Sequence, residues 1–272
     1  MIIVFDTWGG LCNQFYDINC GINFCIVNNF KFTFRNCGFR NKNLVSWTDE
    51  PFDKLFDISS IIERYKHLYI NPNGLELTDD NTYNINGNLA NRVFSNNYIE
   101  ELEKITKKYV ILKQFWALNA FSCIVDPNIY QEIKTSSKII SLYNRLKYQL
   151  VKSNEKYNFI HYRYEADFTQ HFKLTVRSLK DIILELKPQF KNPELKIYIA
   201  TSSIRSVINL DDDDVKEIIF TKNEDELKDY NFEELAFVDY MFGLDSNEVY
   251  GHHNSSFSVM LNALKGTYNF YA

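Results

Sequence analysis

The sequence lacks the features of a membrane-spanning, disulfide-bonded or nucleic-acid-binding protein. No run approaches the roughly 18 apolar residues that a membrane-spanning helix needs. The five cysteines include no CxxC pair, and an odd number in a chain of 272 residues does not indicate a disulfide framework. The net charge of −5 provides no broad basic surface for nucleic acid. Asp6 interrupts the short apolar start, so we expect no signal peptide and predict a soluble, cytoplasmic protein.

Motifs for common cofactors are also missing. Neither the dinucleotide fingerprint GxGxxG nor a P-loop occurs, which argues against a Rossmann dehydrogenase. The adjacent His252 and His253 would point to opposite sides of an extended segment, which does not suit a two-histidine metal site. The four acids at 211–214 are typical of a solvated loop. Neither pattern indicates a metal site, and none of these motifs indicates a resident cofactor.

Strand and helix patterns alternate along the chain, and this alternation predicts an α/β fold. A strand over 1–5 is followed by a glycine turn and by a helix over 13–30. From 157 to 266 the alternation is regular, which implies a parallel sheet covered on both faces. Further predicted elements are strands over 31–36 and 109–116, a helix over 51–65, and one or two helices over 127–153.

Ligands of parallel sheets gather beyond the carboxyl ends of the strands. This rule singles out four turns of the sequence, at 6–14, 161–168, 200–205 and 250–257. The first, WGGLCNQ, places two glycines before a helix N-terminus, whose backbone N–H groups suit phosphate. The same pattern is also typical of an ordinary tight turn, and Asn13 is either a helix N-cap or a ligand donor.

The second turn, HYRYEADF, concentrates charge behind an apolar strand. Strand alternation sends His161 and Arg163 to the same face, where an arginine forms a bidentate fork for phosphate oxygens. The alternative is a surface ion pair of Arg163 with Glu165 or Asp167, and a histidine that only satisfies a backbone carbonyl. The residues alone leave both interpretations open.

The last turn, GHHNSSFSVML, places Ser255 and Ser256 ahead of an apolar helix. The simple interpretation is an N-cap, since serine and asparagine are preferred there. The functional interpretation adds hydroxyl and backbone N–H groups aimed at a diphosphate.

Three motifs, taken in order, resemble the GDP-fucose-dependent fucosyltransferase superfamily, and most closely its protein O-fucosyltransferase-like branch with the plant-type members. They are GGLCNQ near the N-terminus, HYRYEADF after mid-chain, and FVDYMFGLDSNEVYGHHNSSFSVMLNALKG near the end. Together they cover about a quarter of the chain, and 40–155 resembles nothing we can name. The resemblance implies a GT-B arrangement, with two Rossmann-like domains whose parallel sheets face each other across a cleft. The first, 1–150, would be on the acceptor side, and the second, 151–272, would bind the nucleotide sugar.

The resemblance also assigns roles to individual residues. Arg163 would hold the β-phosphate and His161 would lie against the nucleotide. Asp239 would bind the guanine or ribose side. The diphosphate would lie in a cradle formed by Asn254, Ser255, Ser256 and Phe257. The turn formed by Gly9, Gly10, Leu11 and Asn13 would approach the reacting sugar, with Asn13 also a catalytic candidate.

The implied activity is metal-independent, inverting transfer of fucose from GDP-fucose to a hydroxyl of a glycan or protein acceptor. Some relatives carry a glutamate in the N-terminal glycine turn, which is absent here. The candidate bases are therefore Asp6, Glu165 and Asp167. Two alternatives stay open: a GT-B transferase with another nucleotide sugar, and a non-catalytic module that binds a nucleotide or glycan. The acceptor, the linkage and the oligomeric state stay open too.

Overall fold

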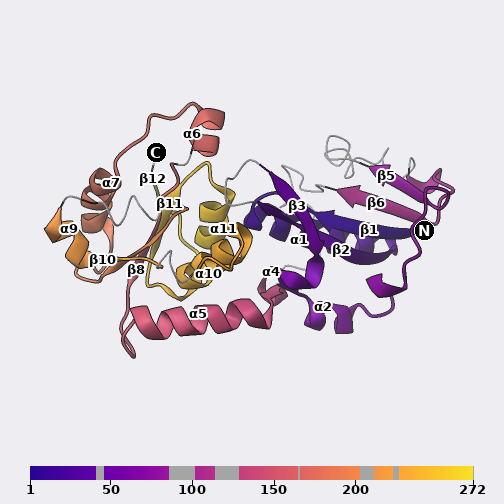
Figure 1. Ribbon diagram of the computed structural model, residues 1–272, viewed down its shortest axis with the longest axis horizontal. Helices are drawn as coiled ribbons and strands as arrows, with labels where there is room; N and C mark the ends of the chain where they lie inside the picture. Colours follow the sequence, from indigo (N-terminus) through magenta and orange to yellow (C-terminus); the bar gives the residue numbers. More distant parts are fainter. Residues whose placement is uncertain are drawn as a thin grey trace. The chain divides into compact units, whose positions relative to one another are not determined.

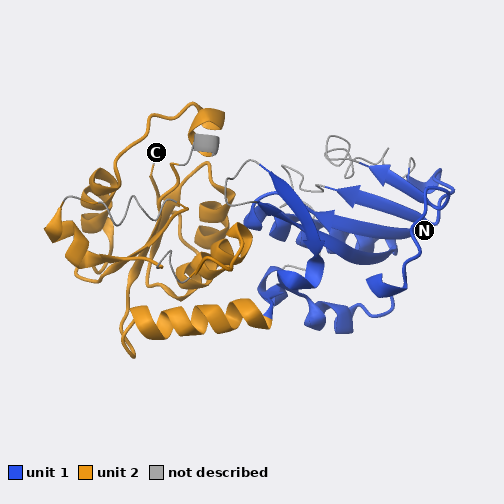
Figure 2. Ribbon diagram, viewed as in Figure 1, with its two compact units in different colours: residues 1–136 blue, residues 137–272 orange. Residues whose placement is uncertain are grey.

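The structure, a computed structural model, divides the chain into two compact units, 1–136 and 137–272 (Figure 2). It describes residues 1–40, 46–85, 102–113, 129–164, 166–202, 210, 212–222 and 227–271. The boundary lies before helix α5 (Ser137–Leu150), which the sequence analysis placed at the end of the first domain. That helix packs against α10 (Phe232–Asp245) of the second unit, where the rings of Tyr143 and Phe242 lie 5.1 Å apart.

The first unit is built on a five-stranded sheet with the order β3-β2-β1-β6-β5 (Figure 1). Its strands are β1 (Ile2–Thr7), β2 (Lys31–Arg40), β3 (Trp47–Pro51), β5 (Thr82–Ile85) and β6 (Tyr109–Lys113). The pairs β1–β2, β1–β6 and β5–β6 are parallel, and β2–β3 is antiparallel. Helix α1 (Leu11–Asn28) packs on β1 and β2 and ends at Asn29, which is left-handed with φ of 52°. The predicted strand, glycine turn, helix and strand at the N-terminus are confirmed.

The segment after β3 forms short pieces, so the helix predicted over 51–65 is wrong. The pieces are a 3-10 turn η1 (Phe52–Lys54), β4 (Phe56–Asp57) and α2 (Ser59–Arg64). Phe52 stacks on Phe34 with 4.8 Å between ring centroids and on Phe56 with 5.2 Å. This aromatic stack overrides the helical spacing of the two phenylalanines. The unit also contains η2 (Pro72–Gly74), α4 (Ile129–Glu132) and β7 (Lys134–Thr135), which pairs with β4.

The second unit contains the parallel sheet that the sequence predicts, in the order β10-β9-β8-β11-β12. Its strands are β8 (Asn158–His161), β9 (Ile197–Ala200), β10 (Ile219–Phe220), β11 (Val249–His252) and β12 (Phe270–Tyr271), and all four pairings are parallel. Ile160 and Ile199 pack with α7 (Leu179–Leu186) and α9 (Asp213–Ile218) on one face. Tyr198 stacks on Phe242 of α10 on the other face, at 4.3 Å.

The strand order of each unit reverses direction at one place. In the second unit the chain runs outward from β8 to β9 and β10, and then returns to β11 on the other side of β8. In the first unit β2 lies on one side of β1 and β6 on the other. Ligands of doubly wound sheets bind beyond the carboxyl ends of the strands at such switch points. The candidate positions are therefore the ends of β8 and β11, and the end of β1.

The helices are short or mixed in polarity. None of those that the structure describes is long and apolar enough to cross a bilayer.

Part of the acidic run at 211–214 is helical. Asp212 caps α9 by accepting the Val215 N–H at 3.1 Å, and Asp213 and Asp214 form its first turn. The loop predicted there is corrected, because acids are favoured at a helix N-terminus.

Candidate functional site

The carboxyl ends of β8 and β11 lie side by side in the second unit, where Gly251 pairs with His161. β8 leads into HYRYEADF and β11 into GHHNSSF, so two turns that are almost 90 residues apart in the sequence share one edge of the sheet. His161, at the end of β8, is only 8% exposed and its Nδ1 lies 2.8 Å from the Ser258 hydroxyl of α11 (Ser256–Lys265). Its ring also contacts Phe257, with centroids 4.4 Å apart.

His161 is held neutral by its surroundings. Burial and the positive charges of Arg163 and Lys222 place the pKa of His161 well below its ordinary value. A neutral imidazole with Nδ1 engaged by Ser258 keeps Nε2 as one further hydrogen-bonding atom. The residue is therefore suited to hydrogen-bond a ligand and unsuited to supply charge.

Gly251 and Ser258 make this contact possible, and the sequence analysis did not identify either of them. A Cβ on Gly251 would lie 2.2 Å from the Ser258 hydroxyl and 2.5 Å from its Cβ. Glycine thus lets α11 approach β11 closely enough for Ser258 to reach His161. The GHHNSSFS pattern contains the signal, a glycine seven residues before a buried serine.

Arg163 follows β8 and is half-buried. Its guanidinium lies over the ring of Phe168, 5.1 Å from the centroid, in a cation–π contact. Its backbone N–H donates to the Tyr271 hydroxyl at 3.2 Å, and that hydroxyl donates to the His161 carbonyl at 2.6 Å. Tyr271 of β12 therefore fixes the backbone on both sides of Tyr162. The predicted ion pair with Glu165 or Asp167 involves side chains outside the described residues.

The start of α11 presents backbone N–H donors at the edge of the sheet where β8 leads to Arg163. The first backbone N–H that the helix satisfies internally is that of Val259, which donates to the Ser255 carbonyl at 2.9 Å. Ser255 occupies the N-cap position and is buried, but its side chain makes no capping hydrogen bond. The simple N-cap interpretation is thus incomplete. The N–H groups of Ser256 and Phe257 carry the positive end of the helix dipole, which suits an anion.

His252 fixes the turn that leads into α11. Its Nδ1 accepts the backbone N–H of Asn254 at 3.2 Å, so the proton of the neutral ring is on Nε2. That Nε2 is buried and has no hydrogen-bond partner among the described residues. Phe168 contacts the ring edge-on at 5.0 Å, and His253 stacks on it at 4.7 Å. Burial and the neighbouring His253 lower the pKa of His252 to about 4.

Asp239 is engaged by the protein itself. Its Oδ1 accepts the Tyr198 hydroxyl at 2.7 Å, and its Oδ2 forms an ion pair with Lys222. Lys222, which the sequence analysis missed, follows β10 and also donates to the Thr201 carbonyl after β9, at 3.4 Å. Burial, together with the neighbouring Asp239 carboxylate, raises the pKa of the Tyr198 phenol well above its ordinary value. The pair lies at the same carboxyl edge of the sheet and contributes a buried lysine to it.

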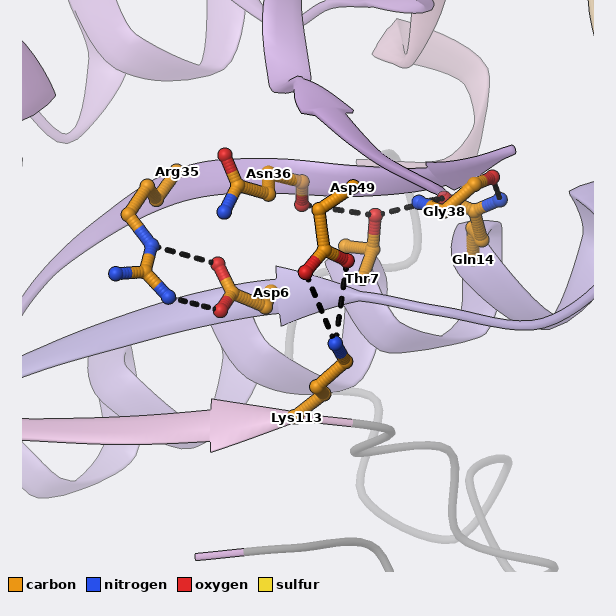
Figure 3. A network of polar contacts seen from close by, with 8 residues as sticks. All are labelled: Asp6, Thr7, Gln14, Arg35, Asn36, Gly38, Asp49 and Lys113. Atoms are coloured by element: carbon orange, nitrogen blue, oxygen red, sulfur yellow. Dashed lines mark hydrogen bonds and ion pairs between the residues drawn. The ribbon is translucent and has the colours of Figure 1, made fainter. Parts of the chain in front are cut away.

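The glycine turn of the first unit is fixed by one buried glutamine (Figure 3). The Gln14 amide donates to the carbonyls of Gly9 at 2.9 Å and Gly38 at 2.7 Å, and its oxygen accepts from Thr7 at 2.8 Å. Gly9 is left-handed, with φ of 96°, which favours glycine. Gly10 is the N-cap of α1, so the N-cap interpretation of Asn13 is wrong. Leu11 is buried in the core, which leaves only its backbone to face a ligand.

The candidate bases differ in what surrounds them. Asp6 is buried and both of its oxygens accept from Arg35 of β2, with Nε at 3.0 Å from Oδ1 (Figure 3). This ion pair raises the pKa of Arg35. Glu165 lies outside the described residues, and Asp167 lies in α6 (Ala166–Phe172) with a side chain that is also outside them. Within the described ranges, no group of three or more His, Cys, Asp or Glu side chains could hold a metal ion.

Comparison with known proteins adds a fold-level assignment. No protein-family model matches the chain, and no curated protein matches it in sequence. Among solved structures, POFUT1 in complex with GDP-fucose matches with a TM-score of 0.68 at 10% identity, over 100% of this chain and 98% of that chain. The fucosyltransferase NodZ from Bradyrhizobium matches with a TM-score of 0.53 at 12% identity, over 96% and 91%. The chain has a GDP-fucose fucosyltransferase-like fold.

This fucosyltransferase-like fold confirms the resemblance inferred from the three motifs. Its structural relatives also include the NodZ alpha-1,6-fucosyltransferase soaked with GDP-fucose, with a TM-score of 0.53 at 12% identity, over 97% of this chain and 92% of that one. Identities this low establish the fold and no more. The roles of Arg163, His161 and the α11 cradle are therefore argued from their own geometry.

The two buried histidines of the fucosyltransferase-like fold predict a loss of stability in mild acid. Both have lowered pKa values in the folded chain, so between their ordinary value of about 6.5 and their folded values only the unfolded chain takes up protons. The free energy of unfolding should fall as the pH drops below about 6.5, by at most about 1.4 kcal/mol per pH unit for each histidine. Urea unfolding at several pH values measures the slope. His252→Gln should flatten it, whereas His67→Gln at an exposed position should not.

Proposed function

We propose that the protein is a GT-B glycosyltransferase that transfers fucose from GDP-fucose to a hydroxyl of a glycan or protein acceptor. Transfer proceeds with inversion and without a metal ion. The observation that supports the proposal is that Arg163, which follows β8, and the N-terminus of α11, which follows β11, come after neighbouring strand ends at the switch point of the second sheet. Solved structures of the same fold, POFUT1 and NodZ, are described with GDP-fucose or GDP.

The diphosphate of the donor is the group that this edge suits best. Arg163 supplies a bidentate cation for the β-phosphate, and the positive charge of Lys222, which is paired with Asp239, also acts on His161. Backbone N–H groups at the start of α11, with the hydroxyls of Ser255 and Ser256, complete an anion cradle. Asn254 precedes this cradle, and Phe257 lies against His161. His161 then contributes a neutral hydrogen bond to the nucleotide.

The chemistry of fucosyl transfer explains the arginine. In the transition state the bond from the anomeric carbon to the diphosphate lengthens, the sugar becomes cationic, and negative charge grows on the departing GDP. Fixed positive charge at that leaving group stabilises the transition state more than the ground state, which is what raises the rate. Arg163 and the dipole of α11 supply such charge in a preorganised form, in the role that a metal ion fills in other transferases.

The acceptor hydroxyl must lose a proton, and the three candidate carboxylates are not equivalent. Both oxygens of Asp6 are occupied by Arg35, so Asp6 acts as a base only if that ion pair opens. Glu165 and Asp167 adjoin Arg163 in the sequence and remain the preferred candidates. Asn13, with Gly9 and Gly10, stays a candidate for contact with the reacting sugar.

Calorimetric titration with GDP, GDP-fucose, GDP-mannose, UDP-glucose and ADP tests the donor. We expect micromolar binding of GDP that persists in EDTA, and a preference for GDP-fucose over the other nucleotide sugars. Binding of UDP-glucose instead would favour a transferase with another donor. Binding of GDP without release of fucose, alone or with acceptors, would favour the non-catalytic module. A requirement for a divalent ion would contradict the metal-free mechanism.

A further inference from the structure

Two tryptophans form a stacked pair at the carboxyl edge of the first unit's sheet. Trp8 directly follows β1 and Trp47 begins β3, and their ring centroids lie 5.4 Å apart with 30° between the planes. Gly38 of β2 lies beneath both rings, since a Cβ there would be 3.0 Å from Trp8 and 3.3 Å from Trp47. The Trp8 backbone N–H donates to Asp17 at 3.0 Å, which fixes the Trp8 backbone beside the glycine turn. The fold therefore holds this pair in a defined place.

Charged side chains surround the pair. The Lys113 ammonium lies 3.8 Å from the Trp8 ring centroid and the Arg40 guanidinium 5.3 Å from that of Trp47. Lys113 also contacts both oxygens of Asp49 at 3.1 Å (Figure 3). The side chains of Lys113 and Asp49 remain 30% and 43% exposed. Cation–π pairs and a surface ion pair of this kind contribute little to stability, so stability alone does not explain them.

The tryptophans also keep unused hydrogen-bonding capacity. In the described part of the chain neither indole N–H donates to a protein acceptor, and neither is a buried unpaired atom. Both rings are only partly buried. An amphipathic ring with an apolar face and a polar edge is a common anchor for ligands that are themselves partly apolar and partly polar.

We propose that this surface, made by Trp8, Trp47, Arg40, Asp49 and Lys113, binds the acceptor, and that the acceptor is a neutral oligosaccharide. This inference rests on the proposed function and adds the acceptor class to it. A sugar ring presents C–H groups to an aromatic face and hydroxyls around its rim. The surface offers a tryptophan face, donors from the indole, lysine and arginine groups, and an acceptor from Asp49. The cation over Trp47 lies farther from its ring, at 5.3 Å, than the cation over Trp8, at 3.8 Å, so Trp47 is the first choice for substitution.

Charge favours a neutral glycan over an anionic ligand. The Lys113 ammonium is paired with Asp49, whose exposed carboxylate would repel a phosphate or a uronate, and the Arg40 guanidinium lies over the Trp47 ring. The first unit thus differs from the second, where Arg163 and a helix N-terminus suit a diphosphate and the buried Lys222 is paired with Asp239. The two surfaces fit the two substrates of a transfer reaction, one anionic and one neutral.

A printed array of neutral and acidic oligosaccharides, probed with the labelled full chain, tests the inference. We expect retention on neutral glycans, confirmed by calorimetry with the best ligand. Trp47→Ala should weaken that binding by about tenfold or more, the effect typical of a central aromatic anchor. Tyr83→Ala changes an aromatic residue of the same unit that is 47% exposed, and it should leave the affinity unchanged. Asp49→Asn and Trp47→Phe probe the polar contacts with little risk to folding.

The outcomes separate this inference from the proposed function. GDP binding in the Trp47→Ala variant should equal that of the unchanged chain, because the donor surface lies on other strands. If GDP fails to bind at all, the proposed function fails whatever the array shows. If GDP binds, either of two results would overturn the proposed acceptor surface. The first is that no glycan, or only acidic glycans, is retained. The second is that Trp47→Ala and Asp49→Asn bind neutral glycans as well as the unchanged chain does.

Discussion

Arg163→Lys should lower kcat/KM for GDP-fucose by two to three decades, or about 3 kcal/mol of transition-state stabilisation. The substitution keeps a positive charge but removes the planar fork that binds two phosphate oxygens at once. It also removes the cation–π contact that places the guanidinium over Phe168. Folding should be unaffected, since the contact between Arg163 and Tyr271 uses the backbone N–H. Steady-state release of GDP at varied donor concentration measures the effect.

Arg177→Lys is the matched control for this experiment. Arg177 lies on the same unit in a surface ion pair with Glu185, so its replacement should change neither binding nor turnover. Separating kcat from KM adds a second distinction. If Arg163 acts on the departing diphosphate, its replacement lowers kcat. If Arg163 only binds the donor, its replacement raises KM and leaves kcat unchanged. Donor kinetics within a factor of about two of the unchanged chain would contradict the assignment of Arg163 to the leaving group.

The carboxyl ends of the strands were the most predictable part of the structure. A buried strand that stops at a polar residue is a local pattern, and a parallel sheet places all such ends at one edge. Consequently His161 and Ser255, which are distant in sequence, could be expected at one site. The N-terminal glycine turn was predictable for the same reason, because glycine marks special backbone geometry locally.

The supporting residues could not be predicted, because each acts through a contact that no local pattern encodes. Ser258 bonds a histidine 97 residues away, and Tyr271 bonds the carbonyl of the same histidine 110 residues away. Lys222 reads as an ordinary residue after a strand, yet its ammonium is buried against Asp239. The helix predicted over 51–65 was wrong for a related reason. Phe52 and Phe56 have helical spacing, but they stack in an aromatic cluster with Phe34 of a neighbouring strand.

Asp239→Ala should cause the largest loss of stability among single substitutions at the carboxyl edge of the second unit's sheet. The side chains of Lys222 and Asp239 are 3% and 9% exposed, so removing the carboxylate leaves a buried ammonium without compensation. It also deprives the Tyr198 hydroxyl of its acceptor. Breaking a buried pair in this way typically costs about 3–5 kcal/mol. Urea unfolding measures it, and Asp213→Ala, which removes an exposed pair with Lys216, should cost less than about 1 kcal/mol.

The double variant Lys222→Met/Asp239→Leu then separates structure from ligand binding. Replacing both charges with apolar groups removes the unpaired ion, and most of the lost stability should return. If Asp239 only positions Lys222 and Tyr198, the double variant loses only the part of the GDP affinity that Lys222 contributes. Lys222→Met alone should then lose the same amount. If Asp239 also contacts the guanine or ribose, the double variant binds GDP more weakly than Lys222→Met does. An unfolding free energy for Asp239→Ala within about 0.5 kcal/mol of the unchanged chain would contradict the buried pair itself, because a buried lysine cannot lose its only carboxylate partner in the described chain without cost.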